Sequence, residues 1–124
     1  MKQLSDSERA LVEPIDQAAM LAQTERWSAI NSGTGNLAGL ARQADELAGA
    51  FAALPGDVEL REPAPVTAVD GEGREAALEH GRHLVLRVRP EGERRLLLTG
   101  HMDTVFAPDH PFQAGTWTDE DTLN

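Results

Sequence analysis

Cysteine is absent from this sequence. Its absence excludes disulfide scaffolds, zinc sites built from thiolates and cysteine nucleophiles. Any metal ion held by the chain must therefore be bound through histidine, aspartate, glutamate or water.

Basic residues are scarce, with 11 lysines and arginines against 21 aspartates and glutamates and a formal net charge of -10. Nucleic-acid binding rests on lysine and arginine side chains that neutralise phosphates, so no nucleic-acid partner is expected. So acidic a surface also disfavours anionic membranes. The simplest role of the acidity is solubility.

Long apolar runs are missing as well. The amino terminus, MKQLSDSE, has one lysine followed by acidic residues and no apolar stretch of the kind that a secretory signal needs. No run of about twenty apolar residues occurs that would form a membrane-spanning helix. With 124 residues and 40% hydrophobic residues, the sequence predicts a soluble, cytoplasmic domain with its own core.

The first half of the sequence is helical in pattern. Ser5 and Glu8 have capping-box spacing, which predicts a helix beginning near residue 6. A second helix is predicted over residues 14–27, with Pro14 in its first turn. The residues expected to face inward here are Leu11, Ile15, Ala18, Ala19 and Ala22.

Turn-favouring residues at positions 31–36 predict a loop, and Asn36 is the expected N-cap of the next helix. Pro55 and Gly56 are expected to end that helix. Its apolar residues recur at three- and four-residue steps and are Leu37, Leu40, Ala41, Ala44, Leu47, Ala48 and Phe51.

The second half reads as strands. Val58 alternates with Leu60, Val66 with Ala68, and the apolar residues of 84–88 also alternate, whereas residues 70–81 are polar and predict a loop or strand edge. The run LLLT at 96–99 predicts a strand buried on both faces. Helices followed by strands predict an α/β arrangement in which helices pack on a sheet.

The string GHMDTV at 100–105 directly follows that predicted buried strand. Ligands and catalytic groups collect at the carboxyl ends of strands in open α/β sheets. His101 is therefore a candidate metal ligand, and Asp103 is a candidate partner for its other ring nitrogen. The His-x-Asp spacing by itself is common in proteins. On the spacing alone, an exposed histidine without a function is a more common interpretation than a metal ligand.

The longer string LLLTGHMDTVF at 96–106 resembles a motif of one family of zinc-dependent peptidases and amidohydrolases. That family includes glutamate carboxypeptidase, acetylornithine deacetylase and succinyl-diaminopimelate desuccinylase. Three further segments resemble it in the same order: an early loop at 27–36, the loop at 107–112 that follows the motif in the carboxypeptidase branch, and a strand-rich stretch at 115–124.

The resemblance implies that residues 1–124 are the amino-terminal part of a three-layer, zinc-exopeptidase-like catalytic domain, with two helices and then strands of a mixed sheet. His101 would bind one of two zinc ions, and Asp103 would orient it. Cobalt or manganese could replace zinc. The implied reaction is hydrolysis of an amide bond in an acylated amino acid or small peptide.

The sequence departs from the family by containing none of the motifs expected after Asn124, which carry the bridging aspartate, the glutamate base and the remaining ligands. The separate domain through which family members form homodimers is also absent. A single histidine does not make a catalytic zinc site, so the chain alone is expected to be inactive. Without further strands beside it, the apolar run at 96–99 is expected to promote aggregation.

Two alternatives remain open at this point. The chain could be a short protein derived from that family that serves in binding or has lost its function. It could also be an unrelated acidic interaction domain in which the motif arose by chance.

Overall fold

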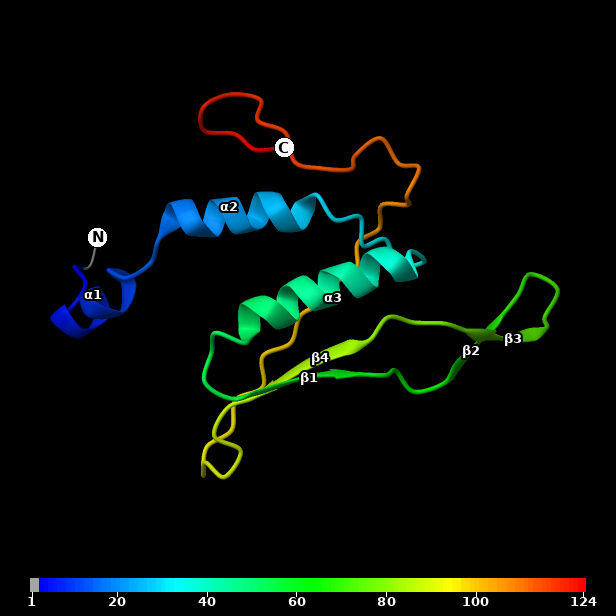
Figure 1. The fold of residues 1–124 in the computed structure, drawn as a ribbon, viewed down its shortest axis with the longest axis horizontal. Coiled ribbons are helices and arrows are strands. Elements are labelled where there is room, and N and C mark those ends of the chain that lie inside the picture. Colours follow the sequence, from blue (N-terminus) through cyan, green and yellow to red (C-terminus); the bar gives the residue numbers. More distant parts are fainter. Residues whose placement is uncertain (1–2) are drawn as a thin grey trace.

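The computed structural model describes residues 3–124, in which three helices precede four short strands (Figure 1). The helices are α1 (Asp6–Val12), α2 (Gln17–Ser28) and α3 (Leu37–Phe51). The strands are β1 (Asp57–Arg61), β2 (Val66–Val69), β3 (Glu75–Leu78) and β4 (His83–Arg87). Helices followed by strands are thus confirmed as the general architecture.

The two amino-terminal helices form where the residue pattern predicts them, but the second begins later and both are more exposed than expected. The predicted capping box begins α1, because Ser5 Oγ accepts from the Glu8 backbone and Glu8 accepts from the Ser5 backbone. Pro14 lies in the turn between α1 and α2, and α2 begins at Gln17 rather than at Pro14. Three helices form, as the residue pattern predicts, whereas the family resemblance implies two.

Residues expected to face inward from this region are exposed. Leu11 and Ile15 are 77% and 58% exposed, and the alanines at 18, 19 and 22 are exposed as well. The prediction was wrong because no described element packs against α1 or the first half of α2 (Figure 1). An apolar pattern buries its face only where a second element covers it.

Helix α3 holds the core. Asn36 caps it as predicted, with its side-chain oxygen accepting from the Gly39 backbone at 3.1 Å. Leu40 and Ala44 are buried, and the other five predicted inward residues of α3 are half-buried. The helix packs against β1 and β4, whose apolar residues Val58 and Leu60 pair with Leu86 and Leu84.

The four strands form one long hairpin with two antiparallel ladders, β1 with β4 and β2 with β3. Pro63 and Pro65 lie in the interruption between the ladders, where a residue without a backbone N–H cannot continue the pairing. Strand β3 lies within the segment predicted as loop or strand edge. Both ladders of the described residues are antiparallel, so a mixed α/β fold is present and the mixed sheet stays a prediction.

The predicted buried strand at 96–99 is also wrong. These residues adopt no regular structure, and Leu96, Leu97 and Leu98 are 86%, 84% and 83% exposed. A strand buried on both faces needs neighbours to pair with. The described strands pair only with one another, which leaves residues 96–99 without a ladder.

None of the helices in the described part of the chain combines the length and apolar character needed to cross a bilayer.

Candidate functional site

The loop between α2 and α3 holds the GHMDTV segment in place. Thr104 donates its backbone N–H to Ser32 at 2.9 Å, and Thr34 donates its N–H to the Thr104 carbonyl at 3.1 Å. These bonds make a parallel bridge between Gly33 and Thr104. The two segments that resemble the hydrolase family, 27–36 and 96–106, therefore lie side by side.

Gly33 is required for this close approach. A Cβ at position 33 would lie 2.3 Å from the carbonyl oxygen of Phe106. At Gly35, two residues further on, a Cβ would meet nothing within 4 Å. Only the first glycine of this loop is therefore demanded by the packing of the site.

Asn31 joins the same two segments through its side chain. Its amide nitrogen donates to the carbonyls of Phe106 and Ala107, both at 3.2 Å. Its amide oxygen accepts from the Gly33 backbone and from the Asn36 side chain. One half-buried side chain thus fixes the loop, the cap of α3 and the segment after the motif together.

His101 and Asp103 are in contact, as predicted. The Nδ1 atom of His101 lies 2.9 Å from the Asp103 carbonyl oxygen and 3.1 Å from its carboxylate Oδ1. Both neighbours are acceptors, and this geometry favours the tautomer with the proton on Nδ1. The Nε2 atom is left as the acceptor nitrogen, on a side chain that is 84% exposed.

Thr34 completes this group, and sequence reasoning missed it. Its hydroxyl donates to Asp103 Oδ2 at 2.8 Å, so the two carboxylate oxygens are held by different partners. The Thr34 hydroxyl, followed by His101, lowers the pKa of Asp103 below its ordinary value. The signal that could have identified Thr34 is the resemblance of 31–36 to a loop of the same family. Thr104, the next residue of the motif, contributes backbone groups to the same contact.

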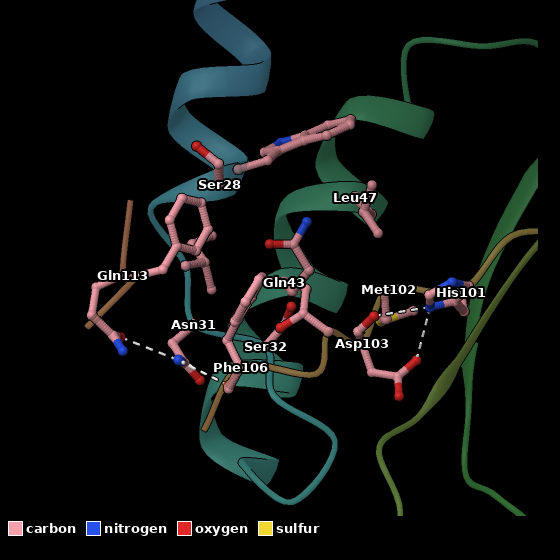
Figure 2. A pocket seen from close by; sticks show the side chains of 14 residues that line it. Ser28, Asn31, Ser32, Gln43, Leu47, His101, Met102, Asp103, Phe106 and Gln113 are labelled. Atoms are coloured by element: carbon pink, nitrogen blue, oxygen red, sulfur yellow. Dashed lines mark hydrogen bonds and ion pairs between the residues drawn. The ribbon is translucent and has the colours of Figure 1, made fainter. Parts of the chain in front are cut away.

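A cavity of about 450 Å³ lies beside the group, between α2, α3 and the segment after the motif (Figure 2). His101 and Asp103 contribute to its lining, together with apolar residues such as Leu47 and Phe106. Two buried atoms of lining residues, Trp27 Nε1 and Gln43 Oε1, have no hydrogen-bond partner within residues 3–124. One is a donor and the other an acceptor.

The donor set of the site supplies one metal ligand. Within residues 3–124, no three histidine, aspartate or glutamate side chains converge to hold a metal ion. His101 with Asp103 therefore matches one ligand and its orienting carboxylate, and His80, His83 and His110 are not brought to it.

Comparisons of the chain with protein-family models, with curated proteins and with solved structures give no match.

Proposed function

We propose that this chain is the amino-terminal part of a metal-dependent hydrolase that cleaves the amide bond of acylated amino acids or small peptides. In this proposal the fold is part of a zinc-exopeptidase-like catalytic domain that operates in the cytoplasm. His101 is a ligand to one of two zinc ions, and Asp103 is the carboxylate that positions it.

The observation that carries the proposal is the arrangement of three side chains from two distant segments. Asp103 engages His101 Nδ1 at 3.1 Å, and Thr34 holds the other carboxylate oxygen at 2.8 Å. Metal-bound histidines characteristically donate their second ring N–H to a carboxylate or carbonyl. The arrangement presents Nε2 to solvent in the form that binds a metal.

The cavity is compatible with the proposed substrate class. Apolar side chains such as Leu47 and Phe106 line it and suit the side chain of an acylated amino acid. His101 lines the same cavity, so the proposed metal ligand borders the space proposed for the substrate.

Zinc, when bound, supplies a water of lowered pKa and polarises the carbonyl of the amide. This chain contributes His101 as ligand, Asp103 and Thr34 as positioning residues, and the cavity wall. The other ligands and the proton-relaying base are not among the described residues. We therefore expect the chain with added zinc to leave an acylated amino acid unhydrolysed, and turnover in a colorimetric amine assay would contradict this.

A zinc titration tests the metal role when the NMR chemical shifts of the ring nitrogens of the four histidines are followed. We expect the chemical shift of His101 Nε2 to change at a lower zinc concentration than those of His80, His83 and His110. Replacing Asp103 by Asn should weaken this binding roughly 10–100-fold, because the ring loses its orienting carboxylate. Asp109→Asn is the matched control, since it removes an equal charge beside His110. Equal effects of the two variants, or equal shifts at all four histidines, would overturn the proposal.

The lack of a three-ligand cluster within residues 3–124 favours a second candidate. In this candidate the chain is a non-catalytic binding protein of the same descent. It keeps the Thr34–Asp103–His101 arrangement but uses the neighbouring cavity for binding alone.

A further inference from the structure

The segment at 106–113 folds back on itself and forms one edge of the cavity. Phe106, Phe112 and Gln113 belong to the cavity wall. The side chain of Asn31 donates to the Phe106 carbonyl and to Gln113 Oε1, which holds both ends of the segment against the loop between α2 and α3 (Figure 2). These bonds join backbone and amide groups that do not titrate, so this frame of the segment is independent of pH.

His110 lies inside this frame and makes a bond that does depend on pH. Its backbone N–H donates to the Ala107 carbonyl at 3.0 Å, which fixes the position of the residue. Its ring nitrogen Nδ1 accepts the backbone N–H of Phe112 at 3.0 Å. A backbone N–H is always a donor, so this bond exists only while Nδ1 carries no proton.

Phe112 depends on this bond for its place in the cavity wall. Within residues 3–124, its backbone makes no other hydrogen bond. The residue before it is Pro111, which has no N–H to donate. The Phe112 ring lies 4.8 Å from the Phe106 ring in a tilted arrangement, which aromatic pairs favour. One hydrogen bond and one ring contact therefore hold Phe112, and loss of the bond leaves only the ring contact.

The charged groups around His110 leave its protonation to the solvent. Asp109 precedes it on the same segment, and within residues 3–124 neither residue forms an ion pair. The loop between α2 and α3 contacts the segment through Asn31, which carries no charge. The titratable residues that line the cavity are His101 and Asp103, and no hydrogen bond or ion pair of the described chain joins them to His110. The pH of the solution therefore sets the charge of the exposed His110 ring.

Histidine is the side chain whose charge ordinarily changes between about pH 5 and 8. A proton on Nδ1 of His110 turns this atom into a donor that faces the donor N–H of Phe112, and their bond is lost. We propose that protonation of His110 releases Phe112 from the wall, so that the cavity opens in mild acid and closes at neutral pH. The charged ring keeps its contact with Phe106, 4.8 Å away, because a cation is attracted to an aromatic face. This switch does not depend on the proposed hydrolase function.

An NMR titration of the full chain between about pH 8 and about pH 5 tests the switch. We expect the Phe112 amide resonance to move with the same midpoint as the ring nitrogens of His110, and the nuclear Overhauser contacts between the Phe106 and Phe112 rings to weaken. Loss of one hydrogen bond should raise the population of released Phe112 roughly two- to tenfold. At about pH 8 the His110 ring should carry its proton on Nε2. A proton on Nδ1 under those conditions, or a Phe112 amide that does not follow His110, would overturn the proposal.

His110→Asn separates the hydrogen bond from the charge. The side-chain oxygen of asparagine takes the place of Nδ1 as an acceptor and stays uncharged at every pH, so the Phe112 amide should keep its bonded position throughout the titration. His83→Asn is the matched control, because His83 lies on β4 and pairs with Arg61 there. It should leave the response of Phe112 as in the parent chain. A Phe112 amide that still titrates in His110→Asn, or that stops titrating in His83→Asn, would refute the switch, and the titration of the parent decides independently of both variants.

Discussion

Two glycines of α3 differ sharply in what an added methyl group would meet. At Gly39 a Cβ would lie 1.8 Å from the Asn31 carbonyl oxygen, whereas at Gly49 nothing lies within 4 Å. We expect Gly39→Ala to lower the free energy of unfolding by roughly 1–3 kcal/mol through overpacking. Gly49→Ala should raise it by about 1 kcal/mol because alanine favours helix. Urea titrations followed by circular dichroism measure both, and changes of the same sign would contradict the described packing of α3 on the Asn31 loop.

At the residue scale, sequence reasoning identified His101 and Asp103 because their chemistry is expressed by a short local motif. Thr34 lies 69 positions from Asp103, and its contact depends on the bridge between Gly33 and Thr104. No periodicity or spacing encodes such a contact. The unpaired atoms of Trp27 and Gln43 were equally out of reach, because they result from how α2 and α3 meet.

The β1–β4 ladder carries an ion-pair group whose stability depends on pH. Glu59 accepts from Arg61 at 2.8 Å and from Arg87 at 3.1 Å, and these hydrogen bonds lower the pKa of Glu59. The carboxyl of Glu59 holds its proton less tightly in the folded state than in the unfolded state. The ion pairs therefore contribute their full stabilisation of the fold above the ordinary carboxyl pKa. This stabilisation is lost as the pH falls through the lowered pKa of the folded state.

We therefore expect Glu59→Gln to destabilise the protein at neutral pH and to match the parent chain in strong acid. Free energies of unfolding measured across acidic pH values test this. Glu93→Gln provides a control, because Glu93 forms no ion pair within residues 3–124. A constant difference between Glu59→Gln and the parent at every pH would contradict the role of the ion pairs.

At the element scale, local signals were sufficient where the chain makes its own contacts. The Ser5 capping box, the Asn36 cap and the apolar face of α3 were predictable because each depends on residues within a few positions. The exposed conformation of 96–99 was not predictable in this way. An apolar run forms a buried strand where neighbouring strands pair with it and stays an exposed segment where they do not. The long hairpin was missed because a pairing of Asp57 with Arg87 spans 30 positions.

At the scale of the whole molecule, the core is small for the length of the chain. Only Leu40 and Ala44 are fully buried apolar residues in the described chain. The slope of the unfolding free energy against urea scales with the area exposed on unfolding. We expect the chain to unfold with a slope below about 1 kcal/mol per molar urea. A steeper, sharply cooperative transition would contradict the described burial.

The central claim of the account is that Asp103 and Thr34 hold His101 in the form that binds a metal through Nε2. A long-range proton–nitrogen NMR spectrum of the metal-free chain at neutral to mildly basic pH tests it most directly, because it distinguishes the two imidazole tautomers. We predict that His101 carries its proton on Nδ1, and that Asp103→Asn weakens this preference without abolishing it, because the backbone carbonyl of residue 103 still accepts from Nδ1. A proton on Nε2 of His101 in the parent chain would contradict the claim.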